Sequence, residues 1–196
     1  MPSDPRISAE IATTAARLVV DEGMEYGPAK RRAVRQLGLP PRVALPDNDE
    51  LEDAVREHIA LYHADTQPAE LRALREVAAQ WMERLAEFRP HLCGAVWRGT
   101  ATRLSNIHLQ LYCDDSKSAE IALINQRVDY EVGEASGPRG PIAQLCFNVP
   151  CRALGEPATL VLSILDHDDL RGALRLDARG RSERGDRDAL LRLLAE

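Results

Sequence analysis

The first part of the chain repeats apolar residues at steps of three and four, which is the spacing of one face of an α-helix. Four helices are expected from this pattern: Ser8 to Gly23, about Pro28 to Gly38, Asp47 through Tyr62, and Pro68 to Phe88. Serine is a good helix cap and glycine a natural stop, so Ser8 and Gly23 mark the ends of the first helix. The last helix ends where Pro90 interrupts it.

After Pro90 the pattern changes to the alternation of β-strands. The expected strands are Cys93 to Trp97, Ile107 to Cys113, Arg127 to Val132, Ile142 to Val149 and Thr159 to Leu165. Residues 119–124 fit a helix or a strand, and the turn formers of 133–140 and 178–186 predict loops. The predicted fold class is α+β: a mixed β-sheet of about five strands packed by helices, preceded by a helical N-terminal segment. We expect a helical segment at 1–64 and an α+β domain at 65–196.

Charge and composition narrow the function classes. The 196 residues carry a formal net charge of −6, which argues against broad, charge-driven binding of nucleic acid. No apolar run approaches the ~20 residues that span a bilayer, and the first ten residues lack the apolar core of a signal peptide. The four cysteines have no CxxC spacing and suit buried thiols in a reducing compartment. We therefore expect a soluble cytoplasmic protein without membrane contact.

The stretch GAVWRGTATRLSNIHLQL, residues 94–111, carries a resemblance. Its glycines, Arg98, Ser105 and the apolar residues Ile107 and Leu109 stand at the spacing of polymerase-beta-like nucleotidyltransferases, especially the minimal single-domain kind. The resemblance implies a strand, a short helix and a second strand around a nucleoside triphosphate bound with magnesium. The positions that it assigns to nucleotide binding are Gly94, Ala95, Arg98, Gly99 and Ser105.

The same stretch departs from the family pattern where the chemistry is done. Ala95 replaces the phosphate-turn serine, and Asn106 and His108 replace the two aspartates. Two carboxylates at alternate strand positions share metal ions, whereas an amide and an imidazole supply none of the charge that Mg²⁺ prefers. The candidate strand for a third carboxylate, PIAQLCFNV, offers Gln144 and Asn148. The expected result is a degenerate site without standard two-metal catalysis.

Three functions follow from this stretch. The leading hypothesis is a nucleotidyltransferase-like pseudoenzyme that binds a nucleotide, RNA or a protein partner, with a phosphate or RNA patch made of Lys30, Arg31, Arg32 and Arg35. The first alternative is an active, divergent enzyme that holds Mg²⁺ or Mn²⁺ with His108, Asp114 and Asp115 and transfers a nucleotide to RNA or protein. The second is a structural interaction module whose old cleft is filled by Trp97 and Tyr112.

Three weaker signals remain. The stretch EIATTAARLVVDEG resembles the first helix of tetracycline-repressor-type regulators, which would imply a helix-turn-helix DNA-binding protein, but Pro40-Pro41 stands where the recognition helix should start. The cluster Asp166 to Asp169 is interpreted preferably as the cap of a helix or turn. A Ca²⁺ or Mn²⁺ site is the alternative interpretation. His58 is interpreted as a packed or edge histidine rather than a ligand.

Overall fold

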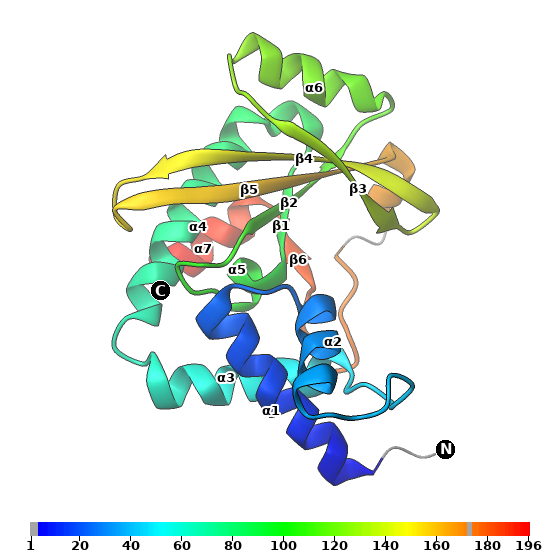
Figure 1. Ribbon diagram of the computed structural model, residues 1–196. Helices are drawn as coiled ribbons and strands as arrows, with labels where there is room; N and C mark the ends of the chain where they lie inside the picture. Colours follow the sequence, from blue (N-terminus) through cyan, green and yellow to red (C-terminus); the bar gives the residue numbers. More distant parts are fainter. Residues whose placement is uncertain (1–3, 172–173) are drawn as a thin grey trace. The chain divides into compact units, whose positions relative to one another are not determined.

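The computed structural model describes residues 4–171 and 174–196, so residues 1–3 of the expected helical segment lie outside it. The chain forms two compact units, both drawn in Figure 1. The helical unit extends to Ala69 and includes Thr100–Ser105, and the sheet unit comprises Glu70–Gly99 and Asn106–Glu196. The division thus follows Ala69, where we expected a boundary after residue 64. No helix among the described residues is long and apolar enough to cross a membrane.

The helical unit is built from α1 (Pro5–Glu22), α2 (Tyr26–Gln36) and α3 (Asn48–Tyr62). Their apolar faces meet in one core, in which Ile11, Leu18, Leu51 and Val55 are fully buried. Each such side chain stabilises the fold by roughly 1.5–3 kcal/mol relative to exposure. The prediction that the periodic apolar residues form the buried faces of helices is therefore confirmed.

The segment Thr100–Ser105 joins the helical unit through a close approach at Gly23. This glycine ends α1 in the left-handed conformation with φ 67°. A Cβ atom at Gly23 would lie 2.9 Å from the backbone oxygen of Leu104, so a larger residue would push the two segments apart. Nearby, the Gln67 side chain donates a hydrogen bond to the Ala101 carbonyl at 2.9 Å.

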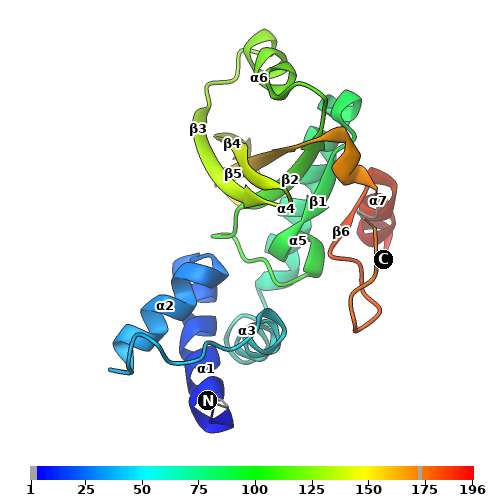
Figure 2. The same cartoon turned by 90° about the vertical axis from the view of Figure 1, so that its right-hand side faces the viewer.

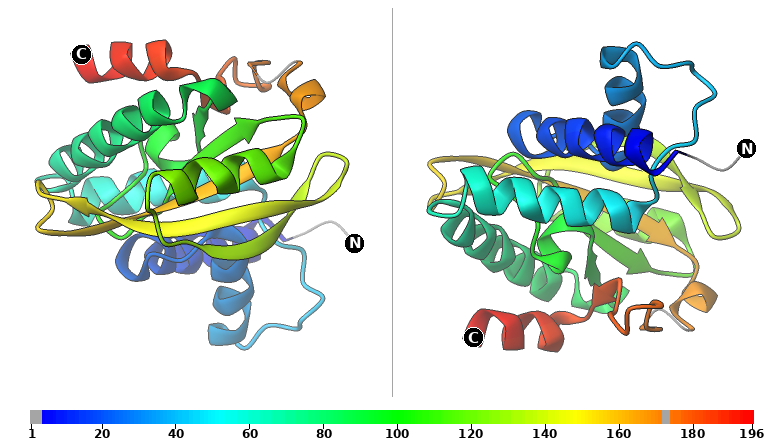
Figure 3. Two further views of the ribbon diagram at one scale, coloured as in Figure 1. Left: turned by 90° about the horizontal axis from the view of Figure 1, so that it is seen from above. Right: turned by 90° about the horizontal axis from the view of Figure 1, so that it is seen from below.

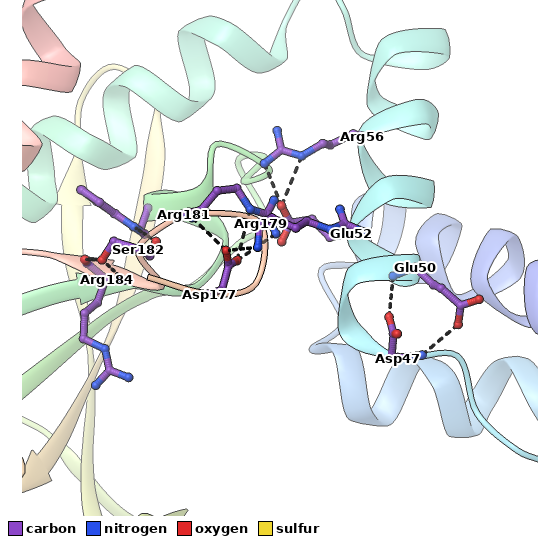
Figure 4. Close-up of polar contacts among 10 residues, drawn as sticks. Asp47, Glu50, Glu52, Arg56, Asp177, Arg179, Arg181, Ser182 and Arg184 are labelled. Carbon is purple, nitrogen blue, oxygen red and sulfur yellow. Dashed lines mark hydrogen bonds and ion pairs between the residues drawn. The ribbon is translucent and has the colours of Figure 1, made fainter. Parts of the chain in front are cut away.

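The start of α1 differs from the prediction, whereas the start of α3 agrees with it. Asp4 caps α1 and is followed by proline, the residue best suited to a first helical position. Ser8 lies inside the helix, where it is buried and donates a hydrogen bond to Glu50 at 3.1 Å. Asp47 caps α3 in a reciprocal capping box with Glu50, whose two hydrogen bonds are drawn in Figure 4.

The sheet unit holds a six-stranded mixed sheet, which confirms the predicted α+β class. Its strands lie in the order β3-β4-β5-β2-β1-β6, with bounds β1 His91–Cys93, β2 Ile107–Tyr112, β3 Glu131–Gly137, β4 Gly140–Cys151, β5 Glu156–Leu165 and β6 Arg184–Gly185. The central pair β2 and β5 is parallel, and the other neighbours are antiparallel. The helical elements are α4 (Gln67–Arg84), η1 (Ala86–Phe88), α5 (Gly94–Arg98), α6 (Ser116–Asn125), η2 (His167–Leu170) and α7 (Arg187–Ala195).

The sheet has an apolar face and a polar face, because residues opposite each other in register point to the same side. On the apolar face Leu92, Leu109, Leu162 and Leu145 are fully buried in one cross-strand row. Trp81 of α4 packs on the same face against Phe147, with ring centroids 4.8 Å apart. Helix α7 lies alongside α4 (Figure 3). Arg187 of α7 forms an ion pair with Glu83 of α4 at 3.2 Å.

Two strand predictions were wrong. Residues 95–97 lie in the short helix α5 rather than in a strand, because the left-handed Gly94 turns the chain directly after β1. The turn-rich segment 133–140 forms most of β3 and a tight turn to β4, with β3 beginning at Glu131 rather than at residue 127. β3 is an edge strand whose side chains are mostly exposed, so no apolar alternation marks it. The ambiguous residues 119–124 are helical, within α6.

Candidate functional site

The candidate site is the connection from β1 through α5 to β2, near the middle of the sheet unit (Figure 2). Gly94 opens α5 with φ 70° and Gly99 ends it with φ 82°, conformations that favour glycine at both positions. In the antiparallel pair of β1 and β2, Cys93 lies opposite His108. A Cβ atom at Gly94 would lie 3.5 Å from His108 Cδ2, so the imidazole lies directly against the glycine.

Two side chains fix α5 in place. The guanidinium of Arg75 donates to the carbonyls of Val96 and Trp97 at 3.1 and 3.2 Å, which satisfies carbonyls at the end of the helix. The indole of Trp97 donates to the Ser182 carbonyl at 2.8 Å and covers Gly185 of β6. Because Gly185 lies opposite Leu92, Trp97 is on the apolar face, away from His108.

The residues assigned to nucleotide binding do not all lie in this unit. Ala95 and Arg98 are half-buried in α5, and Asn106 is half-buried directly before β2. Ser105, by contrast, belongs to the helical unit. Its hydroxyl accepts a hydrogen bond from the Thr102 amide at 3.0 Å and closes a turn there.

The structure does not bring His108 together with Asp114 and Asp115. His108 lies near the start of β2 and the two acids follow its end at Tyr112, so four residue steps of strand, about 13 Å, lie between His108 and the segment that carries the acids. Asp115 caps α6 by accepting a hydrogen bond from the Lys117 amide at 2.9 Å. Within residues 4–171 and 174–196, the one group of three side chains that could hold a metal ion does not include His108.

The strand next to β2 is β5, rather than the PIAQLCFNV strand from which a third carboxylate was sought. Val161 and Ser163 of β5 lie opposite His108 and Gln110 and carry no charge. Gln144, on β4, is one strand further out and donates a hydrogen bond to Ser163 at 3.1 Å. The polar face therefore has no acidic residue beside His108 on β5.

A cavity of about 560 Å³ opens beside the start of β3 and the neighbouring residues of β4 and β5. Its lining residues are Asp129, Tyr130, Glu131, Cys146, Phe147, Asn148 and Thr159. Because Ile107 pairs with Leu160, the register places Asn106 next to the row of Thr159 and Asn148, whose side chains share a hydrogen bond of 2.8 Å. The cavity thus lies on the polar face over β3, β4 and β5, and Thr159 is its lining residue nearest in register to Asn106.

The two carboxylates that line this cavity belong to Asp129 and Glu131. Neither residue was a candidate site residue in the sequence analysis. They are exposed, and they flank Tyr130 at a spacing of two at the start of β3. Two acids at alternate strand positions could have indicated a metal site, but residues 127–132 were interpreted only as a strand. Tyr130 is fixed by a hydrogen bond to Glu120 of α6 at 3.2 Å.

The far end of the polar face is filled by a buried network. Tyr112 is 2% exposed, and its hydroxyl donates to Gln110 at 3.0 Å. Arg184 donates to the same Gln110 oxygen at 2.6 Å, and the His91 ring meets Tyr112 edge-on at 5.3 Å. Burial raises the pKa of Tyr112, and the contact with Arg184 opposes that rise. Neither Tyr112 nor Trp97 lines the cavity of about 560 Å³, and Trp97 lies on the face of the sheet opposite to His108.

The predicted basic patch is not one exposed surface. Lys30 is buried, and its ammonium donates to the Pro46 carbonyl at 2.7 Å and to Asn48 at 2.8 Å. Burial lowers the pKa of Lys30, while the charges of acidic side chains at the start of α3 oppose that shift. Arg32 pairs with Glu22 at 2.6 Å, which leaves Arg31 and Arg35 as the exposed members outside these contacts.

The remaining signals have structural roles in the described chain. After α2 no helix forms before Asn48, so the recognition helix of a helix-turn-helix is missing from residues 37–47. Asp166 caps η2 by accepting from the Asp168 amide at 2.8 Å, and Asp169 pairs with Arg139 at 2.9 Å. Comparison of the chain with protein-family models, with curated proteins and with solved structures finds no match.

Proposed function

We propose that the sheet unit is a nucleotidyltransferase-like domain that binds a nucleotide without standard two-metal catalysis. The observation that carries the proposal is the contact between Gly94 and His108. The glycine that opens the short helix and the strand position of the second expected aspartate lie against each other, as phosphate and metal positions do in the family that residues 94–111 resemble. A cavity of about 560 Å³ on the same face of the sheet, over β3, β4 and β5, has the size of a small-molecule site.

The substitutions at Asn106 and His108 change how a phosphate is held. Two carboxylates repel a phosphate unless metal ions lie between them, whereas an amide and an imidazole N–H donate hydrogen bonds directly. With uncharged side chains on the adjacent strand β5, a phosphate meets no acid beside His108 on that strand. We therefore propose nucleotide binding that needs no divalent ion. The proposed compartment is the cytoplasm, where thiols such as Cys93 and the cavity residue Cys146 stay reduced.

Residual transfer activity is a second candidate, favoured by the two acids of the cavity. Asp129 and Glu131 are the carboxylates from which Mg²⁺ or Mn²⁺ bound to a triphosphate would draw its ligands. Incubation with labelled nucleoside triphosphates and RNA or protein acceptors tests it. Transfer that is lost in Asp129→Asn and Glu131→Gln would support the enzyme, and binding without transfer would support the pseudoenzyme.

Calorimetric titration with ATP, CTP, GTP and UTP, each with and without Mg²⁺, tests the binding proposal. The wild-type chain should bind at least one of them equally well in both conditions. Restoring the acids by Asn106→Asp and His108→Asp should weaken metal-free binding at least tenfold and make binding depend on Mg²⁺. His167→Asp, which adds one acid elsewhere in the same unit, is the matched control. Absence of binding to any nucleotide, or an unchanged affinity in the doubly acidic variant, would refute the proposal.

A further inference from the structure

The carboxyl ends of α1 and α3 come together in the helical unit and carry three metal-ligating side chains. Asp21 lies in the last turn of α1, His58 in the last turns of α3, and His63 is the residue that ends α3. The Nε2 atoms of His58 and His63 lie 3.1 and 3.0 Å from the same oxygen of Asp21. The three ligand atoms all lie within 4.8 Å of one another.

These distances are close to those of a filled metal site. Metal bonds of about 2.0–2.1 Å in tetrahedral geometry separate neighbouring ligand atoms by about 3.3 Å. Entry of an ion therefore requires each imidazole nitrogen to move a few tenths of an ångström away from the Asp21 oxygen, with the two nitrogens, which lie within 4.8 Å of each other, also set about 3.3 Å apart. Such a shift is available, because Asp21 and His63 are partly exposed and only His58 is nearly covered.

The local electrostatics favour a cation at this point. Each helix carries a partial negative charge at its carboxyl end, and two such ends converge on Asp21, His58 and His63. Asp21 is the carboxylate on which both imidazoles converge, through one and the same oxygen.

The cluster forms part of the wall of a cavity of about 670 Å³ within the helical unit. Its other lining residues are Thr13, Thr14, Arg17, Ala54, Glu57, Leu61 and Tyr62. Tyr62 packs against His58 with ring centroids 4.7 Å apart and holds the imidazole in place. A three-ligand site at a cavity wall leaves a fourth coordination position that solvent or a ligand can reach.

We propose that Asp21, His58 and His63 bind a divalent transition-metal ion, Zn²⁺ by preference, with the remaining coordination position facing this cavity. Two imidazoles and one carboxylate suit Zn²⁺, whereas hard ions such as Mg²⁺ and Ca²⁺ require more oxygen ligands. The ion links the ends of α1 and α3, so it also stabilises the helical unit. This site is independent of the nucleotide site proposed for the sheet unit.

Titration of the metal-free full chain with Zn²⁺ against a chromophoric chelator tests the site. One ion per chain should bind, and Mg²⁺ should not compete. Asp21→Asn, His58→Gln and His63→Gln keep the size of each side chain and should each weaken Zn²⁺ binding at least tenfold. His167→Gln removes a histidine outside the cluster and should leave the affinity unchanged.

A second measurement uses the wild-type chain and does not depend on the folding of a variant. In nuclear magnetic resonance spectra, Zn²⁺ should shift the imidazole resonances of His58 and His63 while those of His91 and His167 stay in place. Zn²⁺ should also raise the melting temperature of the wild-type chain but not that of His63→Gln. A merely hydrogen-bonded cluster predicts no zinc binding, or binding that the three substitutions leave unaltered, and either result overturns the proposal.

Discussion

Gly185 is the position where a single added carbon has the largest calculable effect on the sheet unit. A Cβ atom there would lie 2.1, 2.3 and 2.7 Å from three ring carbons of Trp97, whereas unstrained carbon contacts lie at about 3.5–4.0 Å. Gly185→Ala must therefore move the indole, and with it the hydrogen bond from Trp97 to the Ser182 carbonyl. The backbone itself can accept alanine, because Gly185 does not have a positive φ.

The expected cost combines three effects. Overpacking of a filled site costs about 1–3 kcal/mol, and loss of the hydrogen bond adds about 1 kcal/mol. Alanine has less conformational freedom than glycine in the unfolded chain, which stabilises the folded state by up to about 1 kcal/mol and opposes these two costs. Gly185→Ala should thus lower the free energy of unfolding by about 1–4 kcal/mol.

Denaturant unfolding followed by tryptophan fluorescence measures this change, because both tryptophans, Trp81 and Trp97, lie in the sheet unit. Gly133→Ala is the matched control: Gly133 lies on the edge strand β3, has no atom within 4 Å of an added Cβ, and should change stability by less than about 0.5 kcal/mol. In the background of Trp97→Leu, where Trp81 remains as reporter, Gly185→Ala should lose most of its cost. If Gly185→Ala behaves like Gly133→Ala, or if its cost is the same with and without Trp97, the reasoning fails.

Three further predictions concern single residues. Asp47→Ala removes the capping box of α3 and should destabilise the helical unit by about 1 kcal/mol, measured by thermal melting in circular dichroism. Hydrogen bonds from the backbone amides of Arg181 and Arg179, in the loop drawn in Figure 4, lower the pKa of Asp177. The stabilisation that the Asp177 carboxylate gives to the folded chain is therefore complete above the ordinary pKa of 3.8 and is lost at lower pH. In that acidic range the amide resonance of Arg181 should shift as Asp177 takes up a proton. Burial, with nearby acids, raises the pKa of Cys113, so its alkylation at about pH 8, followed by mass spectrometry, should be slow and should accelerate in Asp114→Asn.

The helices could be predicted because their signals are local. The apolar face of α3 repeats every three to four residues, and its cap at Asp47 is a residue whose short side chain reaches the next turn. The start of α1 was misplaced because Ser8 and Asp4 are both good caps, and tertiary contact decided between them by burying Ser8. A sequence pattern states which residues suit a helix end, but not which of them has a partner elsewhere.

The errors in the sheet have a different cause. Residues 93–97 form a short apolar run that fits a strand or a buried helical turn, and only the positive φ of Gly94 selects the helix. Residues 133–137 of β3 were predicted as a loop because an edge strand has little apolar surface to bury, so Gly133 and its exposed neighbours look like turn residues. The resemblance of residues 94–111 did imply strand, helix and strand in the observed order, because it uses spacing over a longer stretch.

Metal chemistry shows most clearly what sequence spacing leaves out. The spacing of residues 94–111 singled out His108 as a candidate metal ligand. In the structure His108 lies against a glycine and beside uncharged residues of β5. The histidines that share a carboxylate are His58 and His63, whose partner Asp21 is 37 and 42 residues away and is brought close only by the packing of α1 on α3. The two proposed sites therefore separate: His63→Gln should weaken zinc binding at least tenfold without changing nucleotide affinity, and Asn106→Asp with His108→Asp should weaken metal-free nucleotide binding without changing zinc affinity. If either substitution changed both the zinc affinity and the nucleotide affinity, the two sites would be coupled, contrary to the separate sets of side chains described above.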